Sequence, residues 1–355
     1  MPRLKVALDH GTCYLKLATS NTQEVTMPNV LGEKPSIEWS SRELAPPLFL
    51  DAMEAAIAGG ESHYVGKSAL TQCRARHYVV EEGMIVDKHR ANVTGLSLLT
   101  YTLANENPEP LASIGIEVDT AIGVPVRTSG EMMEQIEKAM IGNHAVELRH
   151  IATGDVIQAF IHVVNARVLP KPYGAIFALE KDPRYAQYSD STFCGFIVDI
   201  GQGSTDILAV EGARILLPAS TTTNIALDTF LNDLANVLTE KFSVNVDAED
   251  LSLAAQQDIV SIFGREVNLC DFKDRLARDV AQQIFAVASR CLRALPIGSH
   301  ATHRILLIGG GSYLLGPYLQ RMFEAKGYRN VFRPPDPLMI NARGFVQYGE
   351  LAWPN

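Results

Sequence analysis

The stretch Phe196–Val210, which reads FIVDIGQGSTDILAV, decides the fold of this chain. An apolar run ends at Asp199, a glycine turn follows, and the chain returns through a second apolar run. The earlier stretch Val6–Ala18, VALDHGTCYLKLA, repeats this plan with Asp9 in the corresponding place. Short apolar runs that are separated by glycine and polar residues are typical of two strands joined by a tight turn. The repeat therefore predicts two related halves.

A third glycine turn lies in Arg304–Pro317, RILLIGGGSYLLGP, between an apolar run and a segment with helical spacing. A Rossmann dinucleotide loop is the rival interpretation of such turns. Its G-x-G-x-x-G pattern fails here, because Leu314 occupies the last glycine position. Ile207–Val210 also reads as a strand after the second turn, whereas a Rossmann turn opens a helix. The pattern disfavours a dehydrogenase.

Length, composition and net charge limit the classes of protein to which this chain can belong. A length of 355 residues with 47% hydrophobic and 20% charged residues predicts about two globular domains. The net charge of −9 disfavours direct, non-specific DNA binding, which depends on neutralising phosphates with Lys and Arg. Five cysteines without metal-ligand spacing favour reduced thiols. No apolar run is long enough for a membrane span, and the first strand begins near Leu4, so we expect a cytoplasmic protein without a membrane partner.

The glycine turns predict phosphate binding. Glycine lets backbone N–H groups approach phosphate oxygens, and a neighbouring hydroxyl or ammonium group adds a further donor. Three such turns, fed by strands, indicate a site for a nucleotide triphosphate. The candidate nucleotide-binding residues are Gly11, Thr12, Cys13, Lys16, Gly201, Gly203, Ser204, Thr205, Gly309, Gly310, Gly311 and Ser312.

Two aspartates predict a metal site. Asp9 and Asp199 stand at corresponding strand ends, one in each half. Mg²⁺ in nucleotide sites takes one or two carboxylates together with phosphate oxygens, which suits such a pair. We expect both aspartates to be metal ligands and catalytic residues, with a carboxylate orienting the attacking water.

Apolar periodicity also predicts individual elements. The expected helices are Ala91–Leu103, Glu131–Met140, Asn224–Lys241, Phe272–Leu295 and Tyr313–Ala325. Two separate strands are expected at Ile157–Val164 and Ala166–Leu169, because both runs are rich in β-branched residues.

The chain resembles the actin/Hsp70/sugar-kinase ATPase superfamily, whose phosphate-1, phosphate-2 and adenosine motifs match the three turns in order. The resemblance extends to HYVGKSAL (His63–Leu70), AIGVPV (Ala121–Val126), VLPKPYGA (Val168–Ala175) and DPLMINARGFVQYGEL (Asp336–Leu351). The last of these resembles the second connecting segment of the superfamily, with Ala342 and Gly344 at a tight helix contact. The resemblance implies an α/β protein with the actin-like ATPase fold: two related RNase H-like domains around a nucleotide cleft, each with a smaller outer subdomain.

The same resemblance implies domain boundaries. Domain I is expected to span residues 1–165, with its outer subdomain within about 25–90, and to be completed by a C-terminal helix at 340–355. Domain II is expected to span residues 166–339, with its outer subdomain within about 220–300.

Within the superfamily, the LPKPYGA stretch and the DPLMINARGF ending resemble the bacterial plasmid-segregation actins, the ParM-like and Alp-like group. That resemblance implies a filament-forming ATPase that uses ATP, with GTP as the alternative, and Mg²⁺. It also implies self-assembly and a role in plasmid segregation through a DNA-binding adaptor protein, without direct nucleic-acid binding.

Lys171 departs from the pattern of that group. ParM relatives often carry Glu or Gln at this position, where it orients the attacking water, and a charged lysine cannot accept the proton of that water. We therefore place Lys171 among the catalytic candidates and expect slow hydrolysis. Two alternatives stay open: a nucleotide-binding cytoskeletal scaffold with little hydrolysis, and a sugar or acid kinase of the same fold. A kinase needs a carboxylate base in the first connecting segment, which offers no plain Asp.

Overall fold

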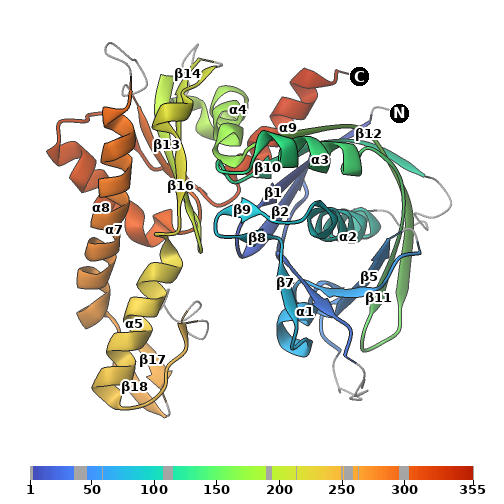
Figure 1. Ribbon diagram of the computed structural model, residues 1–355, viewed down its shortest axis with the longest axis horizontal. Helices are drawn as coiled ribbons and strands as arrows, with labels where there is room; N and C mark the ends of the chain where they lie inside the picture. The colour runs from blue at the N-terminus through green and yellow to red at the C-terminus, as the bar shows by residue number, and fades with distance from the viewer. Residues whose placement is uncertain are drawn as a thin grey trace. The chain divides into compact units, whose positions relative to one another are not determined.

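The structure is a computed structural model that describes residues 3–35, 46–57, 59–106, 115–188, 194–212, 214–248, 251, 259–262, 264–295 and 304–354. The chain divides into two compact units (Figure 1). Unit 1 contains residues 1–189 and 339–355, and unit 2 contains residues 190–338. Each unit has its own hydrophobic core. None of the described helices combines the length and apolar character that a membrane span needs.

The described part of unit 1 is built on a ten-stranded sheet with the order β3-β2-β1-β10-β12-β11-β5-β6-β4-β7, and β8 and β9 form a separate pair. The strands are β1 (Leu4–His10), β2 (Tyr14–Thr19), β3 (Glu24–Pro28), β4 (Val30–Glu33), β5 (Met53–Ile57), β6 (His63–Val65), β7 (Arg76–Tyr78), β8 (Val80–Glu81), β9 (Met84–Ile85), β10 (Ile116–Val124), β11 (Gly142–His150) and β12 (Val156–Pro170). The helical segments are η1 (Phe49–Asp51), α1 (Lys67–Gln72), α2 (Lys88–Glu106), α3 (Gly130–Met140), η3 (Lys171–Tyr173), α4 (Gly174–Lys181), η4 (Pro183–Tyr188) and α9 (Ile340–Ala352).

The described part of unit 2 is built on a six-stranded sheet with the order β15-β14-β13-β19-β20, in which β16 also pairs with β14. β17 and β18 form a separate ribbon. The strands are β13 (Cys194–Ile200), β14 (Thr205–Glu211), β15 (Arg214–Ile215), β16 (Thr221–Thr223), β17 (Ile259–Ile262), β18 (Arg265–Asn268), β19 (Ile305–Ile308) and β20 (Val331–Phe332). The helical segments are η5 (Leu217–Ala219), α5 (Leu227–Phe242), α7 (Cys270–Arg293) and α8 (Ser312–Ala325).

The two sheets repeat one plan, as the sequence predicts. In unit 1, β3, β2 and β1 form an antiparallel meander, and β10 and β12 continue from β1 in parallel. In unit 2, β15, β14 and β13 form the meander, and β19 and β20 continue from β13 in parallel. The predicted fold class, two related α/β halves of the actin-like kind, is confirmed.

Helices cover both faces of the unit 1 sheet, because successive side chains of a strand point to opposite faces. On β1, Leu8 lies against Gly95 of α2, whereas Lys5 lies against Gly349 of α9. Asp9 therefore shares the α9 face with Lys5, and His10 shares the α2 face with Leu8. Both faces of β1 are buried, which explains why its sequence is apolar at nearly every position.

Two expectations about chain organisation differ from the structure. The two strands expected at 157–164 and 166–169 are one continuous strand, β12, whose pairing with β10 shifts register beside Asp119. The expected domain boundary at 165/166 falls inside this strand, whereas the division of contacts lies between Ser189 and Asp190. β12 pairs with β11 over residues 156–163 and with β10 from residue 161 to residue 170, so the residues on both sides of position 165/166 belong to the sheet of unit 1.

Helices α4 and α9 cross at a backbone-to-backbone contact. A Cβ atom at Gly344 would collide with the carbonyl oxygen of Gly174, and a Cβ atom at Gly174 would collide with the backbone of Asn341. Ala342, on the same helix, is fully buried. The tight helix contact that the resemblance implies is therefore present at Gly344, where glycine is needed because no side chain fits between the helices.

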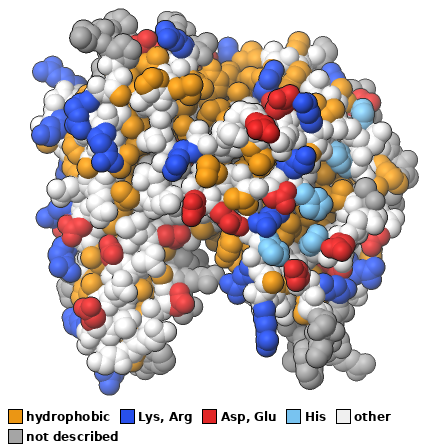
Figure 2. Space-filling model, in the orientation of Figure 1, with side chains coloured by type: hydrophobic (Ala, Val, Ile, Leu, Met, Phe, Trp, Pro, Cys, Tyr) orange, Lys and Arg blue, Asp and Glu red, His pale blue; other side chains and the backbone are white. Residues whose placement is uncertain are grey.

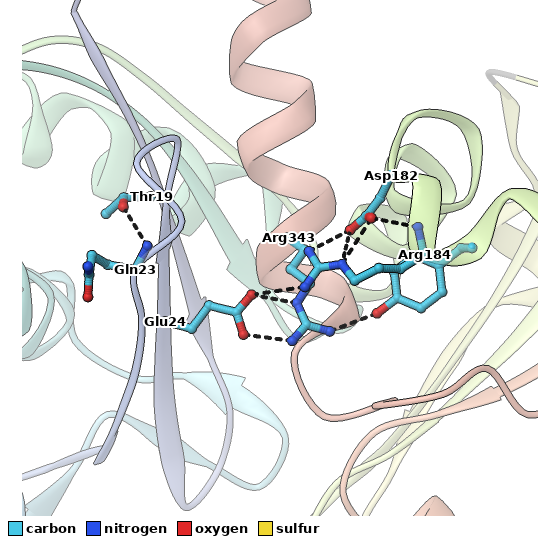
Figure 3. A network of polar contacts seen from close by, with 7 residues as sticks. Thr19, Gln23, Glu24, Asp182, Arg184 and Arg343 are labelled. Atoms are coloured by element: carbon cyan, nitrogen blue, oxygen red, sulfur yellow. Dashed lines mark hydrogen bonds and ion pairs between the residues drawn. The ribbon is translucent and has the colours of Figure 1, made fainter.

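An ion-pair network joins α9 to β3 of the unit 1 meander and to η4 (Figure 3). The guanidinium of Arg343 donates to both carboxylate oxygens of Glu24 on β3, each over 2.6 Å, and to the hydroxyl of Tyr185 over 2.9 Å. Arg184 chelates Asp182 and lies 3.5 Å from Glu24. Burial alone would raise the pKa of Glu24, but hydrogen bonds and charge from Arg343, together with Arg184, lower it below its ordinary value. The sequence gives no local signal for this network, because its members are far apart in the chain.

Replacing Arg343 by leucine is expected to lower the free energy of unfolding of unit 1 by roughly 2–4 kcal/mol, because it leaves Glu24 partly buried without its bidentate partner. The pair stabilises the protein above the unfolded-state pKa of Glu24, and this contribution is lost as the pH falls through the lowered folded-state pKa. Urea unfolding of wild type and variant at neutral and acidic pH measures both effects.

The matched control for this prediction is Arg167→Leu. Arg167 lies 3.7 Å from Glu137, and its side chain is 55% exposed, so its loss should change stability by about 0.5 kcal/mol or less. Equal effects of the two substitutions would contradict the assigned role of Arg343.

Candidate nucleotide and metal site

The first predicted turn closes the β1–β2 hairpin of unit 1. Asp9 and Lys16 face each other across the two strands, and their Oδ2 and Nζ atoms lie 2.9 Å apart. Asp9 is fully buried, and its other oxygen, Oδ1, has no hydrogen-bond partner among the described residues. The structure thus brings together the carboxylate and the ammonium group that the sequence assigns to metal and phosphate.

Asn29 holds this turn in shape, and the sequence analysis missed it. Its side-chain amide donates to the carbonyl oxygen of Gly11 over 2.8 Å, and its backbone N–H donates to the carbonyl oxygen of Cys13 over 2.9 Å. The N–H of Gly11 itself donates to the carbonyl oxygen of Tyr14. Gly11, Thr12 and Cys13 are half-buried. A buried Asn outside the motif leaves no periodic signal, so only the fold reveals its contact with the turn.

Lys171 lies beside Asp9 because three parallel strands end together. Asp9 on β1 pairs with Gly123 on β10, and Gly123 pairs with Leu169 on β12, so Lys171 follows two residues later. A Cβ atom at Gly123 would stand 3.1 Å from Cβ of Lys171 and 3.3 Å from Oδ1 of Asp9. Such an atom would also collide with the ring of Phe345 at 2.5 Å, so only glycine fits among these three side chains. Lys171 is buried, with 3% of its surface exposed.

The second and third turns lie side by side in unit 2. Asp199 on β13 is buried, and it pairs with Ile308, which precedes the turn at Gly309. Gly309 has a φ of +81°, and a Cβ atom there would collide with the Asp199 carboxylate and with the carbonyl oxygen of Ile200. Glycine is required at this position for both reasons. The structure brings Asp199 and the third glycine motif into direct contact.

Several predicted phosphate donors of unit 2 bond within the protein. The hydroxyl of Thr205 donates to the carbonyl oxygen of Ile225 over 2.7 Å, and the hydroxyl of Ser312 donates to that of Gly309 over 2.6 Å. The N–H of Gly311 donates to the carbonyl oxygen of Ile200. These hydrogen bonds fix the conformation of the turns. The hydroxyls of Thr205 and Ser312 therefore position the backbone of the turns.

Gly201, Gly203 and Ser204 form the tip of the second turn. The N–H of Gly201 donates to the carbonyl oxygen of Ser204 over 2.8 Å. The carbonyl oxygens of Gly201 and Gln202 accept from the first N–H groups of α5. Gly201 and Gly203 are half-buried, and Gly310 of the third turn is also half-buried, so the backbone at these three glycines remains the accessible part of the unit 2 turns.

The described side chains do not form a metal site by themselves, but they fit Mg²⁺ that is held together with the phosphates of a nucleotide. Among them, no group of three or more His, Cys, Asp or Glu side chains is placed to hold a metal ion. Figure 2 shows histidines gathered on one side of unit 1, and the rings of His63 and His89 lie 6.2 Å apart, but they belong to no such group. The buried Oδ1 of Asp9, which lacks a partner, fits a metal held by one carboxylate and by phosphate oxygens.

His10, next to Asp9, is a buried neutral histidine. Burial lowers its pKa to about 4, although a hydrogen bond with Asn29 and the charge of Asp9 act in the opposite direction. Its Nδ1 lies 3.4 Å from the side-chain oxygen of Asn29, and its Nε2 has no partner within the described residues. The ring is therefore uncharged at neutral pH and supplies packing beneath the turn.

Acidification is expected to destabilise unit 1 through His10. The folded protein resists protonation of this ring, so stability is unaffected above the ordinary pKa of 6.5, falls as the pH drops from 6.5 to 4, and levels off below that. The loss amounts to roughly 3 kcal/mol. Urea unfolding at pH 7 and pH 4.5 should show a steeper decline for wild type than for His10→Gln. Parallel declines would contradict the buried, neutral state of His10.

Comparisons with known proteins agree with this arrangement. Residues 7–174 match the N-terminal domain of actin-like proteins, and residues 197–321 match the C-terminal domain of archaeal MreB-like actin homologues. Together these matches span the greater part of the chain, and no curated protein matches it. The chain belongs to the superfamily of actin-like proteins.

Solved structures share the fold over nearly the whole chain. An archaeal actin homologue in complex with ADP has a TM-score of 0.71 at 18% identity, covering 98% of this chain and 99% of its own. ParM from Bacillus thuringiensis with AMPPNP has a TM-score of 0.69 at 15% identity, covering 99% of each chain. A 15-stranded ParM filament from Clostridium botulinum has a TM-score of 0.68 at 16% identity, covering 99% of this chain and 100% of its own.

Proposed function

We propose that this protein is a nucleotide-dependent, filament-forming ATPase that acts in plasmid DNA segregation through a DNA-binding adaptor protein. The observation that carries the proposal is the repeated hairpin: Asp9 and Asp199 end corresponding strands of two sheets with the same order, and each is followed by a glycine turn. The relatives solved with ADP, with AMPPNP and as a filament support the nucleotide and the assembly.

Each of the predicted site residues has a role that follows from its chemistry. The turns at Gly11 and Gly201 present backbone N–H groups to the phosphates of ATP, with GTP as the less favoured substrate. Asp9 and Asp199 hold Mg²⁺, which neutralises phosphate charge when it is bound. Lys16 exchanges its contact with Asp9 for a phosphate oxygen, because the same carboxylate is needed by the metal. Asp199 orients the attacking water, since Lys171 has no acceptor atom while it is charged.

Assembly follows from a nucleotide-dependent change between the two units, with the nucleotide favouring the form that polymerises. The partner in the filament is a second copy of this chain. Contact with DNA passes through the adaptor, because the net charge of −9 opposes direct binding. The protein acts in the cytoplasm and needs no membrane partner.

Light scattering of the purified protein tests the proposal. Scattering should rise on addition of Mg-ATP or Mg-AMPPNP and stay low without nucleotide. Negative-stain microscopy of the same samples should show filaments. A flat trace over a range of salt and protein concentrations, together with microscopy that shows no filaments, would reject the assembly function.

Lys171 favours a second candidate, a nucleotide-binding cytoskeletal scaffold with little hydrolysis. Lys171 is buried, its Cβ and Oδ1 of Asp9 both lie near Gly123, and its ammonium group has no acceptor atom for a proton of water. Phosphate release by wild type and by Asp199→Ala separates the candidates. Release that the substitution abolishes supports the ATPase, whereas filaments without release support the scaffold.

A further inference from the structure

We propose that Asn29 is a positioning residue for phosphate binding, which turns two peptide groups of the β1–β2 turn so that their N–H groups face the nucleotide. The inference rests on the proposed function, because it assumes that this turn holds the phosphates. It assigns a role in ligand binding to a residue that lies 18 positions beyond Gly11, outside the glycine motifs.

The N–H of Gly11 is not the phosphate donor of the turn. It donates to the carbonyl oxygen of Tyr14 over 3.0 Å and so closes the turn. A Cβ atom at Gly11 would lie 2.8 Å from that same oxygen, because the two ends of the turn approach each other closely. The donors for a phosphate must therefore come from the residues that follow Gly11.

Asn29 fixes the direction of the peptide groups that follow. Its Nδ2 donates to the carbonyl oxygen of Gly11 over 2.8 Å, and its backbone N–H donates to the carbonyl oxygen of Cys13 over 2.9 Å. In a planar trans peptide group, the C=O of one residue and the N–H of the next point in opposite directions. Both carbonyl groups point toward Asn29, so the N–H groups of Thr12 and Tyr14 point away from it.

The side of the turn that faces away from Asn29 is the accessible side. Asn29 is fully buried, whereas residues 11–13 are half-buried and the side chain of Tyr14 is exposed. A phosphate that approaches from solvent meets the N–H groups of Thr12 and Tyr14. It does not meet the carbonyl oxygens, whose partial negative charge would repel it.

Asn29 can orient the turn because its own position is fixed. Its backbone carbonyl oxygen accepts from the N–H of Val79 over 3.3 Å, and its side-chain oxygen lies 3.4 Å from Nδ1 of His10. Neutral His10 with its proton on Nδ1 donates to this oxygen, so the NH₂ end of the amide faces Gly11. The amide cannot turn over without losing both side-chain hydrogen bonds.

Isothermal titration of the full chain with Mg-AMPPNP tests the inference. Asn29→Leu keeps the size of the side chain and the backbone hydrogen bonds, but it removes the donor to Gly11. The variant should bind about tenfold more weakly, because the carbonyl group of Gly11 is then free to turn toward the phosphate.

Ser68→Ala is the matched control. Ser68 is also buried, and its hydroxyl donates to the backbone carbonyl oxygens of Met53 and Val65, outside the turn. Its loss should lower stability but leave the affinity for Mg-AMPPNP unchanged.

NMR spectra of the backbone amides supply a readout that a purely structural role would not move. When Mg-AMPPNP saturates wild type, the amide protons of Thr12 and Tyr14 should shift downfield, because each N–H gains a charged acceptor. In saturated Asn29→Leu, the shift of Thr12 should shrink, whereas that of Tyr14 should remain, because the backbone of Asn29 still holds Cys13.

Three results would overturn the inference while the proposed function stands: unchanged affinity in Asn29→Leu, an equal loss in Ser68→Ala, or a Thr12 resonance that does not move in wild type. Should Asn29→Leu fail to fold, Asn29→Ser replaces it with the same expected loss, because its hydroxyl is too short to reach Gly11. Failure of wild type to bind Mg-AMPPNP overturns both the inference and the proposed function.

Discussion

Replacing Gly344 by alanine is expected to lower the free energy of unfolding of unit 1 by at least about 3 kcal/mol, or to prevent folding altogether. The added methyl group would collide with the carbonyl oxygen of Gly174, which is backbone and cannot rotate away. Helices α4 and α9 would have to separate. For a unit of this size, the loss corresponds to a fall in melting temperature of roughly 6–12 °C.

Gly349→Ala, in the same helix, is the matched control. A Cβ atom there would meet the Lys5 side chain at 3.4 Å, an ordinary van der Waals contact. Because alanine favours helix over glycine by up to about 1 kcal/mol, this variant should be neutral or slightly more stable. Differential scanning calorimetry of both variants measures the difference. A Gly344→Ala protein as stable as wild type would show that the two helices do not cross at this contact.

Replacing Asp9 by asparagine is expected to weaken binding of Mg-AMPPNP by about a hundredfold and to reduce hydrolysis at least as much, because the metal loses a carboxylate ligand. Asparagine keeps the shape of the side chain, so the β1–β2 hairpin stays intact. Titration calorimetry in the presence and absence of Mg²⁺ measures the effect. The loss should be largest with Mg²⁺ present.

Asp119→Asn is the matched control for Asp9→Asn. Asp119 is a fully buried aspartate on the neighbouring strand, where it pairs with Lys5 over 2.8 Å and accepts from Asn165 over 2.7 Å. Both substitutions leave a buried lysine without its full charge partner and should therefore reduce stability to a similar extent. Only Asp9→Asn should reduce nucleotide binding. Equal losses of binding would mean that Asp9 acts through stability alone.

The sequence predicts those parts of the fold that leave a local pattern. The hairpins at Asp9 and Asp199 could be predicted because in each one an apolar strand, an aspartate near its end and a glycine turn follow one another in the chain. The structure contains both hairpins. The contact of Gly344 could be predicted because the superfamily resemblance places it. The helix expected at 272–295 is α7, whose observed ends differ by two residues at each side.

Contacts between distant segments could not be predicted in the same way. Asn29 supports the Gly11 turn from a neighbouring segment of the sheet, and Glu24 meets Arg343 across 319 positions of sequence. Neither contact leaves a periodicity or a residue spacing in the sequence from which it could be predicted. The hydroxyl of Thr205 was assigned to phosphate by residue type, but its hydrogen bond to Ile225 depends on how α5 approaches the turn.

A crystal structure with Mg²⁺ and AMPPNP tests the central claim most directly, namely that one aspartate from each unit serves a single nucleotide. The account predicts that Asp9 and Asp199 both contact one bound Mg²⁺, directly or through a water ligand, with the phosphates at the Gly11 and Gly201 turns. A nucleotide bound elsewhere, or a metal that only one of the two aspartates can reach, would contradict it.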